Sequence, residues 1–496
     1  MFTITRRPRI LARLRAGAGP ATLSFGEGRD AARVEVALTP LMPSVEATDG
    51  LGAVDAPRWH VVEAAEERDE ANAWDLAHGL VRGDLGITGT AAVEFAEPDL
   101  EQQWIGGAPS AGGFALVEGC DRPRLPSDDG PFDPHDPFWF RDRGHSQLGA
   151  ARDTVGDPAN RRVRVMHLDT GYDPGSALLP RRLNLNLQRN FVEGEDANDA
   201  SDRSEGLFDN LGHGMGTIGI LAGNAVAGTL LGGAPNVEVV PIRVANSVVL
   251  FRNSAIARAF DFVHALAVRE PDIFHVVTMS MGGLASGAWA TAVNSLYDAG
   301  VFVVTAAGNN YGNLPTRHIV YPARFNRVVA ACGVMQDQRP YADLPLTVMA
   351  GNYGPASKMR TAMAAYTPNA PWVRIGCSST VDLDGRGTSS ATPQIAAAAA
   401  LYMQRHMVPL AAYPDPWMRV EAVRKALFDA ASGAGAGLDE RLGRGALRAA
   451  DALALAPAAA LECEERDSAS FALLRTLTGL GVVGTVPDPR QRMLEL

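Results

Sequence analysis

Near-continuous apolar segments alternate with helix-forming segments over the larger, second part of the chain. Runs that read as strands include RVRVMHLDT (162–170), VEVVPIRV (237–244) and FHVVTMS (274–280). Between them lie stretches such as SAIARAFDFVHALAV (254–268) that read as helices. Strands are apolar throughout when helices cover both faces of a parallel sheet. The sequence therefore predicts a doubly wound α/β domain with a mostly parallel sheet.

The chain in front of this domain has a different texture. Residues 31–104 combine short strand-like runs with one amphipathic segment, EANAWDLAHGLV (70–81), and predict a small α+β domain. Residues 105–130 are rich in Gly, Pro, Ser and Asp, and predict a linker between domains. We expect an N-terminal segment over 1–30, the α/β domain over 131–455, and a C-terminal tail of unknown role over 456–496.

Charge and apolar patterning argue against several classes of partner. The net charge is -11 and no basic run of five or more residues occurs, which disfavours nucleic acid or an anionic membrane. Arginines interrupt every apolar run near the N-terminus, so no signal peptide is expected, and Pro8 and Pro20 disfavour an amphipathic transit peptide. We expect a soluble, cytoplasmic protein, with export by another route left open.

Neither the cysteines nor the acidic residues match a known metal-binding motif. The cysteines Cys120, Cys332, Cys377 and Cys463 are scattered singly, which predicts buried thiols rather than disulfides or metal ligands. The acidic stretch EGEDANDASDRSE (193–205) offers oxygen ligands for calcium but lacks the calcium-loop pattern, and it reads as a solvated loop. We therefore expect no cofactor.

Three polar residues follow strands or open helices, where ligand sites form in open α/β sheets. They are Asp169 after the first strand, His213 within GHGMGTIG (212–219), and Ser389 within GTSSATP (387–393). Taken singly, each has an ordinary structural explanation as a turn residue, a structural histidine or a helix cap. GHGMGTIG also contains G-x-G-x-x-G, but the polar stretch before it replaces the strand that a dinucleotide loop needs.

The chain order of these residues narrows the choice. Asp, His and Ser succeed one another as in the subtilisin arrangement. Several ordered blocks accompany them: DTG (169–171), GGAPNVEVVPIRV (232–244), VVTMSMGG (276–283), VVTAAGNN (303–310), YPA (321–323) and GTSSATP (387–393). Over residues 131–455 the sequence resembles the subtilase family of serine proteases.

The resemblance implies a role for each residue of the triad. A serine hydroxyl is a weak nucleophile and needs a base, which in turn needs a carboxylate that fixes its tautomer. Ser389 is implied as the nucleophile, His213 as general base and then acid, and Asp169 as the orienting carboxylate. Asn309 matches the family's side-chain donor to the oxyanion, with the Ser389 N–H as its partner.

The resemblance also implies where substrate lies. An extended peptide is expected to add as a strand beside Ser280, Met281, Gly282 and Gly283. Val320 precedes the Tyr-Pro pair, where familiar members carry a small residue on the floor of the first specificity pocket. We expect Val320 to narrow this pocket and to favour small or medium apolar P1 residues.

Some positions depart from the family pattern. Gly216 stands where a second histidine is common, and Ser390 stands where methionine often follows the nucleophile. DPGSALLP (173–180) replaces the usual His-Pro after the DTG block. None of these changes removes a catalytic group.

The front domain resembles the inhibitor-like propeptides of the same family, on its EPD ending (97–99) and its spacing. The stretch DPFWFRDRGHSQLGAARD (136–153) resembles the start of a mature catalytic domain. A zymogen that cuts itself between about residues 100 and 131 is implied; a permanently attached structural domain is the alternative.

We therefore expect a serine endopeptidase that acts on protein or peptide substrates through an acyl-enzyme, with its own N-terminal domain as inhibitor. The alternative is an inactive subtilase-fold binding or scaffold protein, which is disfavoured because every catalytic position is filled.

Overall fold

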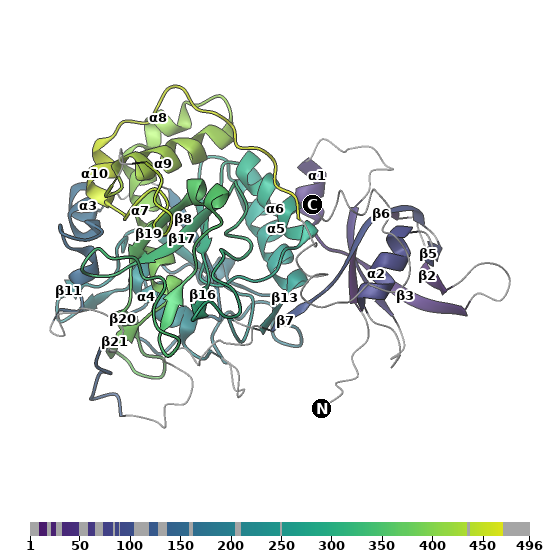
Figure 1. Cartoon of the computed structure of the whole chain (residues 1–496), viewed down its shortest axis with the longest axis horizontal. Helices are drawn as coiled ribbons and strands as arrows, with labels where there is room; N and C mark the ends of the chain where they lie inside the picture. Colours follow the sequence, from purple (N-terminus) through teal and green to yellow (C-terminus); the bar gives the residue numbers. More distant parts are fainter. Residues whose placement is uncertain are drawn as a thin grey trace.

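The computed structural model describes most of the chain. It covers residues 9–16, 21–25, 32–48, 58–64, 73–82, 85–88, 90–103, 119–126, 136–157, 162–203, 210–248, 250–433 and 437–469. Two domains lie beside each other, the α/β domain on the left of Figure 1 and the front domain on the right. Residues 105–118 and 127–130 of the expected linker, the first eight residues and the tail from 470 lie outside the described residues.

A seven-stranded sheet forms the centre of the α/β domain, in the order β19-β17-β15-β14-β8-β12-β9. Each of its neighbouring strands pairs in parallel. The strands are β8 (Val163–Asp169), β9 (Arg189–Asn190), β12 (Glu238–Arg243), β14 (Phe274–Met279), β15 (Phe302–Ala306), β17 (Val329–Val334) and β19 (Ala362–Tyr366). This arrangement confirms the predicted α/β fold.

Helices cover both faces of this sheet. They are α3 (Leu148–Val155), α4 (His213–Ala222), α5 (Asn253–Arg269), α6 (Gly287–Asp298), α7 (Thr388–Arg405), α8 (Met407–Ala411), α9 (Pro416–Ala430) and α10 (Ala449–Ala454), with 3-10 turns η1 (Trp139–Arg141), η2 (Leu185–Leu187) and η3 (Ala356–Thr361). Val165 of β8 shares an apolar cluster with α4 and α7, whereas its neighbour Met166 shares one with α5 and α6. Side chains alternate along a strand, so β8 is buried on both faces.

Short pairs of strands complete the domain. They are β10 (Ala225–Val226) with β11 (Thr229–Leu230), β16 (Asn309–Tyr311) with β18 (Met349–Gly351), and β20 (Ala370–Val373) with β21 (Val381–Gly385). Two residues separate the end of β21 from α7, which begins at Thr388. Ser389 therefore lies in the first turn of a long buried helix.

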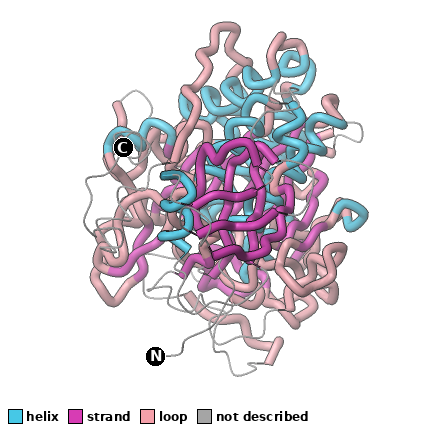
Figure 2. The backbone as a smooth tube through the Cα atoms, turned by 90° about the vertical axis from the view of Figure 1, so that its right-hand side faces the viewer, coloured by secondary structure: helices cyan, strands magenta, loops and turns pink. Residues whose placement is uncertain are grey.

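The front domain is a six-stranded antiparallel sheet in the order β5-β2-β3-β4-β1-β6. Its elements are β1 (Arg9–Ala16), β2 (Ala21–Phe25), β3 (Ala32–Pro40), α1 (Pro43–Thr48), β4 (Arg58–Ala64), α2 (Ala73–Arg82), β5 (Leu85–Thr88) and β6 (Thr90–Pro98). Seen end-on in Figure 2, its strands lie across the near end of the molecule. It has the expected α+β composition.

The expected start of this domain at residue 31 is wrong. β1 lies inside the sheet, between β4 and β6, so the domain begins at or before Arg9. Ile10, Ala12 and Leu14 join the front domain's own apolar cluster, while Leu11 points to the opposite face and into the cluster of α5 and α6. The arginines that interrupt the apolar run, and that disfavour a signal peptide, belong to a β-strand in which they alternate with buried apolar residues.

The two domains share an apolar interface and two helix caps. Trp59 and Val61 of β4 belong to the same buried cluster as Trp289 of α6. The Glu97 carboxylate accepts hydrogen bonds from the Ser286 hydroxyl (2.7 Å) and from the first backbone N–H groups of α6 (2.7 and 3.2 Å). Asp99 accepts from the backbone N–H (2.9 Å) and hydroxyl (2.8 Å) of Ser254 at the start of α5.

A strand pair also joins the domains. The segment after β6 forms β7 (Glu101–Gln103), which pairs antiparallel with β13 (Leu250–Arg252) of the α/β domain. The end of the front domain is therefore bound as an added strand.

The cysteine prediction is wrong for three of the four residues. Cys120 and Cys377 form a disulfide across 257 residues of sequence, with Cα atoms 5.5 Å apart, and Cys463 is exposed. Only Cys332 is a buried thiol as predicted. Cys120 and Cys377 are brought together only by the tertiary fold, so their wide separation in the sequence does not predict the disulfide.

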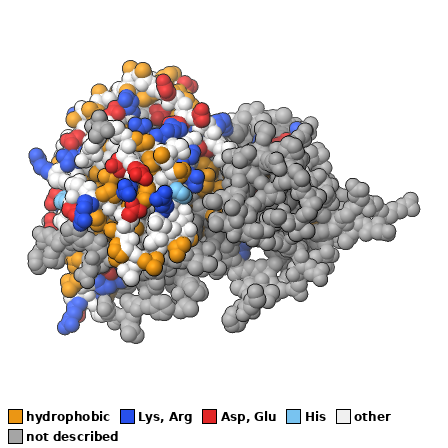
Figure 3. All heavy atoms as spheres, viewed as in Figure 1, with side chains coloured by type: hydrophobic (Ala, Val, Ile, Leu, Met, Phe, Trp, Pro, Cys, Tyr) orange, Lys and Arg blue, Asp and Glu red, His pale blue; other side chains and the backbone are white. Residues whose placement is uncertain are grey.

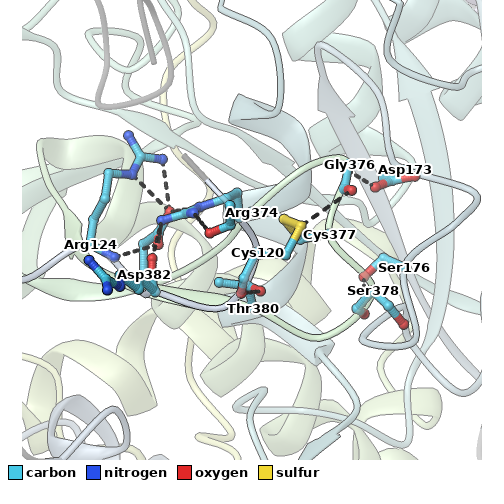
Figure 4. Close-up of a disulfide and its surroundings, with 12 residues drawn as sticks. Cys120, Arg124, Asp173, Ser176, Arg374, Gly376, Cys377, Ser378, Thr380 and Asp382 are labelled. Atoms are coloured by element: carbon cyan, nitrogen blue, oxygen red, sulfur yellow. Dashed lines mark hydrogen bonds and ion pairs between the residues drawn. A yellow bond between two sulfur atoms is a disulfide. The ribbon is translucent and has the colours of Figure 1, made fainter. Parts of the chain in front are cut away.

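The disulfide anchors a described part of the linker, residues 119–126 (Figure 4). The Arg124 side chain and backbone bind Asp382 of β21, which also pairs with Arg374 (Figure 4). Thr380 donates to the Cys120 carbonyl (2.6 Å), and the N–H of Leu383 donates to the Arg124 carbonyl (2.9 Å). This stretch is therefore part of the α/β domain.

The described part of the tail, residues 456–469, also lies against the α/β domain. Glu464 forms a bidentate pair with Arg360 (2.7 and 2.9 Å). Asp467 accepts from the backbone N–H groups of Asn326 (2.7 Å) and Arg327 (3.0 Å). The domain boundary expected at residue 455 thus separates segments that pack together.

On the face of the α/β domain shown in Figure 3, acidic and basic side chains lie among apolar ones. None of the helices in the described ranges has both the length and the apolar character to cross a bilayer.

Candidate active site

The predicted site residues meet at one edge of the large sheet. β8 ends at Asp169, its neighbour β14 ends one residue before Ser280, and β15, next in the sheet, ends three residues before Asn309. Because these strands are parallel, their carboxyl ends lie on the same side. The site therefore lies where open α/β sheets bind ligands.

Asp169 and His213 form a short buried contact. Nδ1 of His213 lies 2.6 Å from Oδ1 of Asp169, and the Thr170 N–H donates to the same oxygen at 2.8 Å. Burial alone would raise the pKa of Asp169, but the charge and hydrogen bond of His213 outweigh burial and hold it below its usual value. The carboxylate is therefore ionised and fixes which imidazole nitrogen carries the proton.

Glycines around His213 allow close backbone contact. A Cβ at Gly214 would collide with the Gly171 carbonyl, and one at Gly219 would lie 2.5 Å from Val373. The Gly214 N–H also donates to the Thr170 hydroxyl at 3.0 Å. Gly214 thus seats the start of α4 against the end of β8, and Gly219 lets α4 approach β20, so both glycines serve close packing.

Asp202 braces the first two elements of the site, and sequence reasoning missed it. Its Oδ2 accepts from the Thr170 hydroxyl (2.7 Å) and the Gly212 N–H (2.8 Å), so it ties the end of β8 to the start of α4. Its other oxygen binds the buried guanidinium of Arg243 at 3.2 Å. The expected solvated loop is therefore wrong at its C-terminal end, where Asp202 is buried.

A second carboxylate of the acidic stretch, that of Glu195, also faces Arg243. Glu195 pairs with this guanidinium at 3.1 Å, so a side-chain cation already neutralises the carboxylates. Among the described residues, no group of three or more His, Cys, Asp and Glu is placed to hold a metal.

Trp372 explains the departure at Gly216. A Cβ at Gly216 would fall within the Trp372 ring, so a larger residue cannot share this space with the tryptophan. The edge of the same ring meets His213, with centroids 5.4 Å apart. Trp372 of β20 thus lies beside His213 and fills the space next to Gly216, the position at which a second histidine is common in the family pattern.

Ser389 and Ser280 bind each other reciprocally. The Ser389 hydroxyl donates to the Ser280 carbonyl (3.2 Å), and the Ser280 hydroxyl donates to the Ser389 carbonyl (3.1 Å). Within the described residues, Ser389 forms no hydrogen bond with His213. Such bonds are often loose before substrate binds.

Asn309 lies against the turn that precedes the nucleophile candidate. Its Oδ1 accepts from the Thr388 N–H at 2.9 Å. Gly387 has φ +82°, and a Cβ there would lie 3.0 Å from the Asn309 amide nitrogen. Because the amide oxygen is held by Thr388, the NH2 group is the side of Asn309 that can donate to a ligand.

The stretch Ser280 to Gly283, which is expected to bind substrate, directly follows β14. The N–H and carbonyl of Gly283 pair with Tyr321 (2.7 and 2.9 Å), so this residue's backbone is already used, and the Met281 side chain is buried in the core. Val320 is buried between two glycines: a Cβ at Gly282 would lie 2.6 Å from it, and one at Gly308 would lie 3.1 Å away. Among the described residues, the backbone groups of Met281 and Gly282 have no such partner, whereas the Ser280 carbonyl accepts the Ser389 hydroxyl.

Comparison with known proteins decides the family. The model of the Subtilase family matches residues 160–445, which is more than half of the chain. The chain belongs to the subtilase family. Its membership places it among the serine peptidases, and the match contains Asp169, His213 and Ser389.

Curated relatives agree with the family match. Subtilisin DY of Bacillus licheniformis is 29% identical over 245 residues, 49% of this chain and 77% of the relative. Alkaline elastase YaB of Bacillus sp. (strain YaB) is 27% identical over 273 residues, 54% of this chain and 60% of the relative. An extracellular serine proteinase of Thermus sp. (strain Rt41A) is 32% identical over 195 residues, 39% of this chain and 41% of the relative. The latter two matches span less than two thirds of those proteins.

Proposed function

We propose that the protein is a serine endopeptidase that works through Asp169, His213 and Ser389. The buried 2.6 Å contact between Asp169 and His213 carries this proposal, since it prepares a histidine to accept a proton. The position of Ser389 in the first turn of α7, at the same sheet edge, supports it further.

The proposed reaction has two halves. Ser389 Oγ turns from the Ser280 carbonyl toward His213, gives its proton to Nε2 and attacks the peptide carbonyl carbon. The tetrahedral intermediate breaks its C–N bond as His213 protonates the departing amine, which leaves an acyl-enzyme. Water then repeats these steps, again with His213 as base and then acid, and releases the carboxylate product and free Ser389.

Asn309 and the Ser389 N–H are proposed to stabilise the oxyanion of each intermediate. The bond from Thr388 to the Asn309 amide oxygen supports this role, because it leaves the NH2 group to donate. Substrate is proposed to lie along Ser280 to Gly282, with its P1 side chain limited by Val320.

The front domain is proposed to be an inhibitory propeptide. The pairing of β7 with β13 supports this role because an added strand at the α/β domain competes with an extended peptide. The two carboxylate caps from Glu97 and Asp99 support it too, since they hold the domain on α6 and α5. Protein substrates and the front domain are then alternative partners of one surface.

Intact mass and N-terminal sequencing of the wild-type chain beside Ser389→Ala test both parts. Loss of the front domain from the wild type alone supports self-processing by Ser389. If both chains stay whole while the wild type hydrolyses a peptide amide and Ser389→Ala does not, the peptidase stands and the propeptide role fails. If both chains are cut alike, Ser389 is not the nucleophile for processing.

A further inference from the structure

Asp169 has a second set of neighbours that the triad does not use. His167 lies two residues earlier on β8, so it faces the same side of the sheet as Asp169. Both side chains are buried, and the register neighbours of His167 are the uncharged Pro241 and Thr278. A histidine thus interrupts a strand whose other members, apart from Arg164 and Asp169, are apolar.

Thr217 connects this histidine to the triad carboxylate. It lies one turn after His213 on α4, and therefore on the same helix face. Its hydroxyl oxygen is 2.8 Å from Nε2 of His167, 3.1 Å from Oδ2 of Asp169 and 3.1 Å from the Gly214 carbonyl of its own helix. Of the two acceptors, the ionised carboxylate forms the stronger hydrogen bond. Oδ2 of Asp169 is not the oxygen that contacts His213, so Thr217 and His213 hold opposite sides of one carboxylate.

The direction of the hydrogen bonds follows from the burial of His167. The charged or titratable groups that face it are Asp169 on its own strand and His213 on α4. Burial lowers the pKa of His167 to about 4, so the ring is neutral and carries one N–H. Nδ1 has no hydrogen-bond partner within the described residues. A buried acceptor without a partner is tolerated better than a buried N–H, so the proton belongs on Nε2.

We propose that His167 and Thr217 are positioning residues of the triad, in a chain in which Nε2–H of His167 donates to Thr217 Oγ1 and the Thr217 hydroxyl donates to Oδ2 of Asp169. This inference rests on the proposed function. The chain fixes the rotation of the carboxylate and leaves Oδ1 to His213. Both residues act through Asp169 and neither touches substrate.

Replacing Thr217 tests the chain. Thr217→Val keeps the volume but removes the donor to a buried carboxylate, so kcat is expected to fall by about tenfold or more with KM changed by less than about twofold. Thr217→Ser keeps the hydroxyl and is expected to retain kcat within about threefold. Thr361→Val, which removes another buried hydroxyl far along the chain, controls for a general effect of this substitution.

Proton NMR provides a readout that needs no catalysis. In the full-length Ser389→Ala chain, the downfield resonance of the His213–Asp169 hydrogen bond is expected to shift with Thr217→Val and to remain with Thr217→Ser. His167→Leu is expected to shift this resonance as Thr217→Val does. His167→Gln retains a hydrogen-bond donor and is expected to leave the resonance where it lies in the parent chain.

The proposal is overturned if Thr217→Val and Thr217→Ser lower kcat equally and lower thermal stability equally. It is also overturned if none of the substitutions at Thr217 or His167 shifts the resonance of the His213–Asp169 hydrogen bond. If the wild type hydrolyses no peptide, the proposed function fails, while the NMR comparison still decides whether Thr217 positions Asp169.

Discussion

Trp372 fills the space that Gly216 leaves open on α4, and the same indole ring meets the imidazole of His213. The missing side chain at Gly216 and the large ring of Trp372 are thus complementary parts of one packing contact. It places an aromatic wall beside the base of the proposed triad.

Adding a methyl group at Gly216 should therefore disturb both stability and catalysis. Gly216→Ala forces the Trp372 ring to move, and overpacking of this kind costs about 1–3 kcal/mol of unfolding free energy. Urea denaturation measures this cost, and kcat is expected to fall because the ring is displaced beside His213. Gly144→Ala is the control, since a Cβ there meets no atom within 4 Å. Equal effects of the two substitutions would contradict the packing account.

Docking of the front domain should weaken as pH rises. Burial raises the pKa of Glu97 to about 7 even though Gly287, Ser286 and Ala288 donate to it. Because the pKa of Glu97 is higher in the docked state than in the undocked state, its protonated form favours docking. This contribution to docking is complete below the undocked pKa and is lost as the pH rises through about 7. Burial likewise raises the pKa of Asp261, which holds α1, to about 6.

Hydrogen exchange at the first amides of α6 measures this docking in full-length Ser389→Ala. After correction for intrinsic exchange, protection is expected to decline between about pH 6 and 8. Glu97→Gln keeps an acceptor but cannot ionise, so its decline should be smaller. Protection that increases over this range would exclude Glu97 as the titrating group.

The disulfide should determine where processing releases the front domain. Cys120 is bonded to Cys377, so a cut after Cys120 leaves the two parts covalently joined, whereas a cut before Gly119 separates them. Because residues 119–126 are bound to β21 and its loop, we expect the cut before Gly119. Electrophoresis of the processed protein with and without reductant distinguishes the two, since fragments that separate only after reduction would show a later cut.

The same disulfide bears on stability and environment. Removing a native disulfide costs about 2–5 kcal/mol, so Cys120→Ser with Cys377→Ser should lower the melting temperature. Because disulfides are rare in the cytosol, we propose an oxidising compartment in place of the expected cytoplasmic location. The Cys463→Ser variant, which removes an exposed thiol outside the pair, is the control.

Val320 should limit the P1 side chain. Val320→Gly removes the side chain that lies against Gly282 and Gly308, so kcat/KM for substrates with P1 Phe should rise by about tenfold or more relative to P1 Ala. A series of peptides that differ only at P1 measures the ratio. A wild-type enzyme that already prefers Phe, Tyr or Arg would show that Val320 does not form the floor.

Elements with strong periodicity were predictable from sequence, and so was the fold family in which Asp169, His213 and Ser389 occur in that order. The strand before Asp169 and the helix after His213 have local apolar patterns that match their burial. β1 was missed because its arginines break the apolar run, although its alternation indicates a strand.

Long-range contacts were the part that sequence could not provide. Asp202 lies in an acidic stretch that reads as solvated, and it becomes buried only when Arg243 and the end of β8 fold against it. The sequence around Trp372 and Thr217 does not indicate their contacts either. Trp372 contacts His213 and Thr217 contacts Asp169, and in each case the partner is distant in the sequence.

Labelling with a fluorophosphonate, followed by peptide mapping, tests the central claim most directly. The account predicts that the wild-type chain, processed or whole, is modified at Ser389, that Ser389→Ala is not modified, and that the neighbouring Ser390→Ala still is. Modification of another residue, or undiminished peptide hydrolysis by Ser389→Ala, would contradict it.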